Sequence, residues 1–324
     1  MSIHQIALVL LASLIGASAA AQSYPAKPIR FVVPSATGGA YEVILRSMQA
    51  MLHEELGQAL VIENKPGGGG VVGLEFVARA EPDGYTILQG GISQIVLNPL
   101  FVGKLPYDPQ KDFVHIAMLG VLVMALYTHQ SLEVNNLKGL IDYAKANPGK
   151  VGYGSSGIGQ SFHLAGEMLK LRTGADFVHV PYKGTAQALQ DFFAGRLLMM
   201  FYPPNGVILD RIKKGEIRPV AAMSDKRLAN LPEVPTFEEL GVGNLGVSGW
   251  GGFSGPAKLP RPIVLRINQA VNKVSARPEV LKSLDSMTMV PLRTTPDEMT
   301  EKVRREIAFW TEMVVKLGIK PGGL

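Results

Sequence analysis

The sequence predicts an α/β protein of two Rossmann-like domains that are joined by a hinge of crossing strands. Short apolar runs alternate with amphipathic helical stretches along most of the chain, which is typical of βα units around a mostly parallel sheet. A unit of strand, Gly/Ser turn and helix occurs twice, at residues 29–56 and 151–171. Two strand-like crossovers, near residues 119–127 and 247–253, would carry the chain between the domains. With 324 residues, 47% of them hydrophobic, the chain is long enough for a core in each domain.

The individual elements follow from hydrophobic periodicity and from turn residues. In the first half, Gly57 is the expected C-cap of the first helix, and the pattern predicts strands at 29–33, 59–64 and 85–90 and helices at 42–56 and 71–80. In the second half it predicts helices at 137–150, 160–174, 185–196 and 206–216, and strands at 151–157, 176–182, 197–203 and 217–224. Three C-terminal helices are expected, at 261–276, 278–287 and 296–318.

Residues 1–22 predict a signal peptide. An apolar run over residues 6–22 ends in small residues, and both 17–19 and 19–21 fit the A-x-A cleavage pattern. The alternative is a buried or membrane-anchoring N-terminal helix, since the stretch before the run has no Lys or Arg. No later apolar run is long enough to span a bilayer. We therefore expect an exported, periplasmic protein, with one lobe formed by residues 23–122 and 250–324 and the other by 123–249.

Composition and motifs argue against several classes of function. The chain has no cysteine, which excludes disulfides, thiolate nucleophiles and cysteine metal sites. Its net charge of +5 comes from scattered residues rather than a basic stripe, so nucleic-acid binding is not expected. The six histidines form no i, i+4 pair, and no G-x-S-x-G, Walker or dinucleotide motif is present. We expect no catalytic residue, metal or cofactor.

The first Gly-rich turn, "VPSATGGAYEVILR" (33–46), predicts half of an anion site. A helix N-terminus presents free N–H groups and the positive end of the helix dipole, and we expect the N–H groups of residues 37–41 to hold the anion. Tyr41 either reaches the ligand or packs on the domain surface. Glu42 lies three residues after Gly39, where it either closes a capping box or contacts the ligand. The candidate residues of this turn are Ser35, Thr37, Gly38, Gly39, Tyr41 and Glu42.

The second turn, "YGSSGIGQS" (153–161), predicts the other half. Its serines can donate hydroxyl and N–H bonds and its glycines allow close approach, although the serines could instead only cap the helix. Because ligands of open α/β sheets bind at the carboxyl ends of strands, the two turns would face each other across a cleft. The candidates here are Ser155, Ser156, Gly157, Gly159 and Gln160. Other strand ends add the candidates Ser93, Tyr182, Thr185 and Tyr202.

Several stretches in a characteristic order resemble one family. They include "YPAKPIRFVVP", "VIENKPGGGGVVG", "PDGYTIL", "YGSSGIGQSFHLAGE", "VPYKGTAQALQDFFAGR" and "LPEVPTFEELG". The chain resembles the substrate-binding proteins of tripartite tricarboxylate transporters, the Bug or TctC type, over nearly everything after residue 22. The resemblance implies a bilobal periplasmic binding fold and a monomer. It also implies capture of a small organic carboxylate (di-, tri- or aromatic) by backbone N–H groups and waters, and delivery to membrane transporter subunits.

The first turn departs from the family pattern at three positions. The family has an aromatic residue after the proline and a Thr/Ser-Asp pair after the glycines, where this chain has Ser35, Tyr41 and Glu42. The departures change the size and polarity of the predicted pocket, so the ligand of better-known members is not carried over. A periplasmic sensor for a signalling system would use the same binding chemistry, and a carboxylate-processing hydrolase is the remaining alternative.

Overall fold

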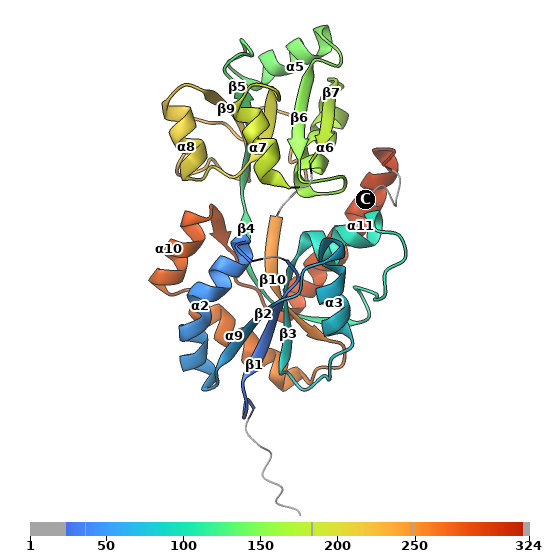
Figure 1. Ribbon diagram of the computed structural model, residues 1–324, viewed down its shortest axis with the longest axis vertical. Coiled ribbons are helices and arrows are strands. Elements are labelled where there is room, and N and C mark those ends of the chain that lie inside the picture. The colour runs from blue at the N-terminus through green and yellow to red at the C-terminus, as the bar shows by residue number, and fades with distance from the viewer. Residues whose placement is uncertain (1–23, 36, 183, 248, 320–324) are drawn as a thin grey trace, which may run out of the picture.

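The computed structural model describes residues 24–35, 37–182, 184–247 and 249–319, which form two lobes that are each built around one mixed sheet (Figure 1). The predicted bilobal α/β fold is confirmed. The expected signal peptide lies outside the described residues.

Lobe 1 contains a six-stranded sheet in the order β11-β4-β10-β3-β1-β2. β1 runs parallel to β2 and β3, whereas β10 is antiparallel to both of its neighbours. One face is covered by α2, α9 and α10, and the other by α3 and α11. The elements are β1 (Ile29–Val33), α2 (Ala40–Leu56), β2 (Leu60–Asn64), α3 (Val71–Ala78), β3 (Thr86–Gly91), β4 (Phe113–Leu122), β10 (Gly249–Pro256), α9 (Arg261–Val274), α10 (Pro278–Ser286), β11 (Met289–Pro291) and α11 (Pro296–Lys316).

Lobe 2 contains a five-stranded sheet in the order β7-β6-β8-β5-β9. Helices α5 and α6 pack on one face, and α7 and α8 pack on the other. The elements are β5 (Met124–His129), α5 (Leu137–Ala146), β6 (Val151–Ser155), α6 (Ser161–Thr173), β7 (Phe177–Pro181), α7 (Thr185–Phe193), β8 (Met199–Tyr202), α8 (Gly206–Lys213) and β9 (Ile217–Met223).

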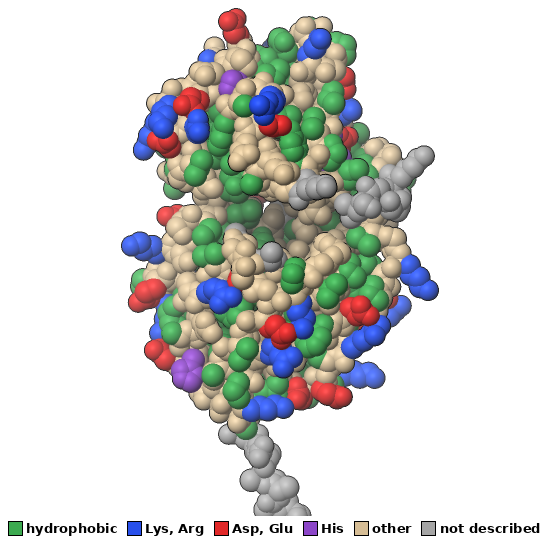
Figure 2. Space-filling model, in the orientation of Figure 1, with side chains coloured by type: hydrophobic (Ala, Val, Ile, Leu, Met, Phe, Trp, Pro, Cys, Tyr) green, Lys and Arg blue, Asp and Glu red, His purple; other side chains and the backbone are tan. Residues whose placement is uncertain are grey.

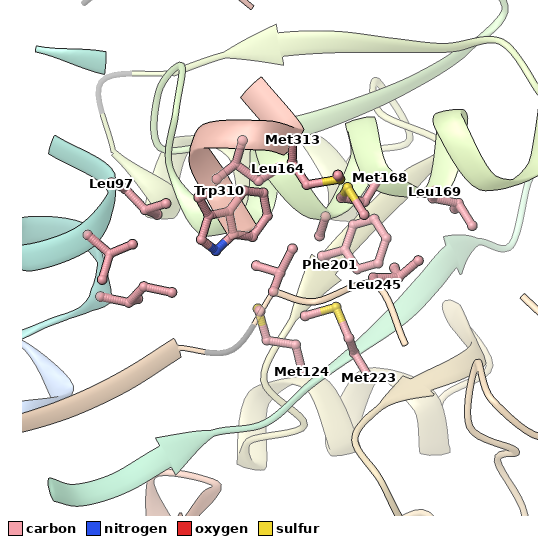
Figure 3. Close-up of a cluster of buried hydrophobic side chains, with 14 of the residues drawn as sticks. Leu97, Met124, Leu164, Met168, Leu169, Phe201, Met223, Leu245, Trp310 and Met313 are labelled. Carbon is pink, nitrogen blue, oxygen red and sulfur yellow. The ribbon is translucent and has the colours of Figure 1, made fainter. Parts of the chain in front are cut away.

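Three connections join the lobes. The chain leaves lobe 1 where β4 runs on into β5, and it returns into β10 at Gly249, as the two predicted crossovers require. The third connection was not predicted: α11 begins against β4, but its last turns carry Trp310 and Met313 into a buried cluster with Leu164 and Met168 of α6 (Figure 3). The hydrophobic core is therefore continuous from one lobe into the other.

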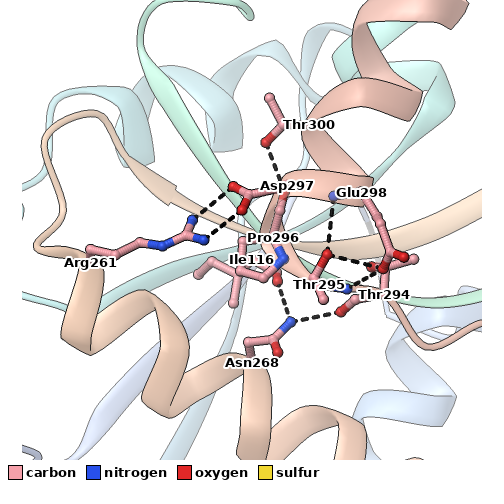
Figure 4. Close-up of polar contacts among 9 residues, drawn as sticks. All are labelled: Ile116, Arg261, Asn268, Thr294, Thr295, Pro296, Asp297, Glu298 and Thr300. Atoms are coloured by element: carbon pink, nitrogen blue, oxygen red, sulfur yellow. Dashed lines mark hydrogen bonds and ion pairs between the residues drawn. The ribbon is translucent and has the colours of Figure 1, made fainter.

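A buried asparagine fixes the start of α11 against lobe 1. The side-chain amide of Asn268 on α9 donates to the carbonyl oxygens of Ile116 (2.7 Å) and Thr294 (2.8 Å), as Figure 4 shows. The next residue, Thr295, forms a capping box with Glu298, which satisfies two N–H groups that the first turn of a helix would otherwise leave unpaired. These bonds set the direction in which α11 leaves lobe 1.

Three short elements and one helix start differ from the sequence-based expectations. A π-helical turn (Ser93–Leu97) and the short α4 (Asn98–Phe101) follow β3, and β11 adds a three-residue edge strand. Elements this short contain too few residues to show a hydrophobic period in the sequence. Tertiary packing, rather than local sequence, determines where they form. In addition, α2 begins at Ala40, two residues before the predicted start.

Candidate functional site

A cavity of about 190 Å³ lies between the lobes, where the surface is visibly hollowed in Figure 2; we call it the main cavity. Both lobes and the crossing strands contribute to its wall. The lining residues are Tyr41, Gly91, Ile92, Ser93, Gln94, Leu122, Met124, Ser156, Gln160, Ser161, Phe162, Thr185, Gly249 and Trp250. The volume suits a ligand smaller than a typical drug-sized molecule.

The polar part of the wall is made by the starts of helices. Tyr41 lies in the first turn of α2, Ser161 is the first residue of α6, and Thr185 is the first residue of α7. None of the described lining residues is a Lys, Arg, His, Asp or Glu. Because residues from the first turns of three helices line this space, and helix starts carry unpaired N–H groups and the positive end of the dipole, the main cavity is suited to an anion held by neutral groups.

The remaining wall is apolar. It consists of Ile92, Leu122, Met124, Phe162 and Trp250. These side chains come from the turn after β3, from the two crossing strands and from the first turn of α6. The main cavity therefore offers hydrogen-bond donors together with a surface for a hydrocarbon chain or ring.

Tyr41 lies against β10 inside the cleft. A Cβ added at Gly251 would be only 2.2 Å from Cδ1 of Tyr41, so the ring packs directly on the strand backbone, where only glycine leaves room. Burial raises the pKa of the Tyr41 hydroxyl, which stays neutral at physiological pH. Tyr41 therefore packs on a strand of its own lobe and at the same time lines the main cavity, which combines features of both sequence-based alternatives.

A second, smaller cavity of about 50 Å³ lies behind Tyr41, and we call it the side cavity. It is enclosed by the ends of β1 and β3 and by the first turn of α2. Its lining residues are Pro34, Ser35, Gly39, Tyr41, Glu42, Gln89, Gly90 and Gln94. Tyr41 and Gln94 line both cavities, so the two cavities adjoin at these residues.

Glu42 braces the first turn. Its carboxylate is 1% exposed; Oε2 accepts the N–H of Gly38 (2.8 Å) and Oε1 accepts Nε of Arg46 (2.7 Å). Burial alone would raise the pKa of this carboxyl, but hydrogen bonds from Arg46, Gly38 and Asn64 outweigh it and hold the pKa below its usual range. The sequence predicts that Glu42 accepts the N–H of Gly39, but in the structure it accepts the N–H of Gly38.

This brace corrects part of the predicted anion site. The N–H of Gly38 already donates to Glu42, so it is not available to a ligand. Thr37 and Gly38 are exposed and line neither cavity, whereas Ser35, Gly39 and Glu42 line the side cavity. Of the six candidates in the first turn, only Tyr41 reaches the main cavity.

In the second turn, Ser156 and Gln160 line the main cavity, whereas the other candidates shape the turn. Ser155 is buried, and its Oγ accepts the N–H of Gly157 (3.1 Å) and lies 2.6 Å from Nε2 of His179. The N–H of Gly159 donates to Nδ1 of His163 (3.0 Å), and a Cβ at Gly159 would lie 2.5 Å from the ring of Phe101 in lobe 1. Sequence reasoning placed these residues at the ligand because it could not foresee their partners.

The candidates from the other strand ends also divide into residues that line the main cavity and residues that do not. Ser93 and Thr185 line the main cavity. The Tyr182 hydroxyl donates to Asp191 (2.7 Å), and the ring of Tyr202 packs on Phe162 (5.9 Å between centroids); neither tyrosine lines the main or the side cavity. The lining residues that the sequence analysis did not anticipate include Gln89, Gln94, Leu122, Met124 and Phe162; they lie at or near strand ends or, for Phe162, in the first turn of α6. Trp250 was expected near the hinge, but not in the cavity wall.

Two neighbouring histidines beneath the second turn lead us to expect that the stability of the protein depends on pH. The rings of His163 and His179 are 4.0 Å apart. Burial lowers the pKa of His163 from 6.5 to about 4, and burial together with the neighbouring His163 lowers the pKa of His179 to about 4 as well. Between about pH 4 and pH 6.5, these two histidines bind more protons in the unfolded chain than in the folded one, so the free energy of unfolding falls as the pH falls. We expect the free energy of unfolding at pH 5 to be lower than at pH 7 by on the order of 2 kcal/mol.

Urea denaturation at pH 7, 6, 5 and 4.5 measures this effect. The variant His163→Asn keeps an oxygen acceptor for the N–H of Gly159 but cannot titrate in this range. We expect a smaller loss of stability on acidification in the variant than in the wild type. Equal losses in both proteins would contradict the role of His163.

The described residues contain no helix that is both long and apolar enough to cross a membrane. They also contain no group of three or more His, Cys, Asp or Glu side chains that could hold a metal ion.

Comparison with known proteins agrees with this architecture. Residues 44–319 match the family described as tripartite tricarboxylate transporter family receptor, TctC. BugT of Bordetella pertussis is 32% identical over 311 residues, which cover 94% of each chain. The structure of the periplasmic binding protein BugD is 31% identical, with a TM-score of 0.76 over 92% of this chain and 100% of that one. The structure of R. palustris Rpa4515 with adipate is 31% identical, with a TM-score of 0.80 over 92% and 99%. The chain therefore belongs to the tripartite tricarboxylate transporter receptor family, whose members are binding proteins rather than enzymes.

Proposed function

We propose that this protein is an extracytoplasmic solute-binding protein, which captures a small organic carboxylate between its lobes and delivers it to membrane subunits of a tripartite tricarboxylate transporter. The observation that carries the proposal is the main cavity, onto which the starts of α2, α6 and α7 open from both lobes. A carboxylate bound there would be held by N–H groups and hydroxyls of two lobes at once, so binding favours the closed arrangement.

The wall of the main cavity supports a ligand with an apolar body. The part-buried side chains of Leu122 and Phe162 offer hydrocarbon surface, whereas a ligand that is polar at every carbon would leave that surface in contact with water. The adipate in the related R. palustris structure is a linear dicarboxylate with four methylene groups. We therefore favour linear or aromatic carboxylates over densely hydroxylated ones.

Export and the membrane partner rest on the family and on the N-terminus. The family is described as the receptor of a tripartite transporter. The apolar run over residues 6–22, which ends in A-x-A patterns, supports secretion to the periplasm. A receptor in that compartment would meet its ligand before the membrane subunits do.

Calorimetric titration with adipate, benzoate and malate tests the binding function, with 1,6-hexanediol as the uncharged counterpart of adipate. We expect adipate or benzoate to bind with a Kd of micromolar order or tighter, which corresponds to about 8 kcal/mol. Hexanediol should not bind measurably, because it lacks the charge that the helix starts stabilise. Absence of binding to all three carboxylates would contradict the proposal.

Ser161→Pro tests whether the start of α6 holds the carboxylate. Ser161 is the first helical residue, where proline is tolerated, and Gln160 before it is already extended (φ −78°, ψ 159°). The substitution removes one N–H from the main cavity, and a hydrogen bond to a charged group contributes roughly 1.5–3 kcal/mol. We expect affinity to fall at least tenfold, whereas Ser161→Ala, which keeps the N–H, should lose less. Equal losses would assign the contact to the hydroxyl instead.

A further inference from the structure

The side cavity extends the cleft into lobe 1. It lies on the face of the sheet that carries α2, beneath the first turn of that helix and next to the ends of β1 and β3. It adjoins the main cavity at Tyr41 and Gln94, which line both. A ligand in the main cavity therefore has the side cavity as its immediate neighbour.

A buried and unpartnered amide faces the side cavity. Gln89 is 2% exposed and lines the cavity, yet none of the described residues hydrogen-bonds with its side chain. The polar atoms of this amide are open to the side cavity rather than sealed in the core, so a bound group or a water molecule can pair with them. A group that both donates and accepts hydrogen bonds would satisfy this side chain.

Two neighbours of Gln89 offer further polar atoms. The amide oxygen of Gln94 accepts the N–H of Gly91 (3.1 Å). The NH2 group of Gln94 can therefore donate to a different acceptor. Ser35 contributes a hydroxyl, for which the described residues provide no hydrogen-bond partner. The side cavity thus contains donors and acceptors in addition to Gln89.

The charge of Glu42 limits what can enter. Glu42 lines the side cavity, and its carboxylate is ionised at neutral pH, because Arg46 and the N–H of Gly38 stabilise the charged form. A second carboxylate would meet a like charge in a poorly solvated space, which is unfavourable. A neutral group could instead donate to Glu42 and accept from Gln89.

We propose that the side cavity is a subsite for a neutral hydrogen-bonding group, a hydroxyl or a primary carboxamide, on a ligand whose carboxylate lies in the main cavity. Its volume of about 50 Å³ has room for such a group but not for a ring. The inference rests on the proposed function and makes hydroxy- and carbamoyl-carboxylates the preferred members of its ligand class. It also gives Gln89 and Glu42 distinct roles, one in recognition and one in exclusion.

Two matched ligand series test the subsite by calorimetry. Each series keeps one carboxylate and one chain length and varies the far end. The first consists of hexanoate, 6-hydroxyhexanoate, adipamic acid and adipate, and the second of butanoate, 4-hydroxybutanoate, succinamic acid and succinate. In the wild type we expect the hydroxyl- or amide-ended acid of the better series to bind at least tenfold tighter than the methyl-ended acid.

The variants identify the residues responsible. Gln89→Leu should reduce this preference to within twofold without weakening the methyl-ended acid, and Gln89→Met provides the same comparison if the leucine variant does not fold. Gln58→Leu, at the opposite end of α2, is the control for the chemical change and should keep the preference. Glu42→Gln should strengthen binding of the dicarboxylate relative to the hydroxy acid.

The outcomes separate the subsite from the function on which it rests. If no acid of either series binds, and the panel of carboxylates also fails, the proposed function is wrong and the subsite with it. If carboxylates bind but the wild type shows no preference, or Gln89→Leu retains it, the subsite proposal is overturned while the function stands. In that case the side cavity serves only to hold water.

Discussion

Gly251→Ala is expected to displace Tyr41 from the cleft wall, to destabilise the fold by about 1–3 kcal/mol and to weaken carboxylate binding at least tenfold. The new Cβ would lie 2.2 Å from Cδ1 and 2.4 Å from Cε1 of the ring, closer than real Cβ atoms come. The backbone of Gly251 is not in the left-handed region, so the effect comes from the ring alone. Chemical denaturation and calorimetric titration measure the two losses.

A double variant and a neighbouring glycine provide the controls. Tyr41→Ala combined with Gly251→Ala removes the clash, so the combination should be less destabilising than the sum of the single changes. At Gly249, on the same strand, the nearest atom to an added Cβ is 3.3 Å away, in Leu122. Gly249→Ala should therefore cost much less stability. Wild-type stability and affinity in Gly251→Ala would mean that Tyr41 does not pack on β10.

Trp310→Ala is expected to destabilise the protein by about 3–5 kcal/mol, because it opens a cavity in the cluster that joins α11 to lobe 2. Trp310 is fully buried, and none of the described residues accepts a hydrogen bond from its indole N–H (Figure 3). Trp310→Phe therefore loses no hydrogen bond and should cost far less than the alanine variant. Urea denaturation, monitored by circular dichroism, gives both values.

Trp250 is the matched control for Trp310. It is equally buried, but its indole N–H donates to the carboxylate of Glu306 on α11. Trp250→Phe should therefore cost more than Trp310→Phe, since a hydrogen bond to a charged acceptor is lost along with the same ring volume. If the two phenylalanine variants were equally stable, the unpartnered indole would not explain the tolerance at position 310.

Features set by neighbouring residues could be predicted, and features set by distant ones could not. The two strand–turn–helix units and the brace by Glu42 follow from local spacing, because helix capping involves residues three or four apart. The partner of Ser155 comes instead from the adjacent strand β7, where His179 lies beside Tyr153 in the register. No local pattern encodes that contact.

The apolar wall of the main cavity was missed for the same reason. β10 lies between β3 and β4, with Gly251 opposite Gly91, although these residues are far apart in the sequence. Only this pairing brings Trp250 to the cavity and gives Tyr41 a flat strand on which to lie. Similarly, the side cavity requires the end of β3 to sit beneath the start of α2, which the sequence order does not reveal.

The central position of β10 also determines the order in which the two sheets can be completed. All strands of lobe 2 lie between residues 124 and 223, so its sheet can form as soon as that continuous stretch has emerged. The sheet of lobe 1 cannot close until residue 256 is available, because its strand β10 must enter between β3 and β4, which were made much earlier. Long-range pairing of this kind is slow, and it leaves the facing edges of β3 and β4 open in the meantime. Nascent lobe 1 is thus the part of the chain most exposed to premature aggregation, even though it begins first.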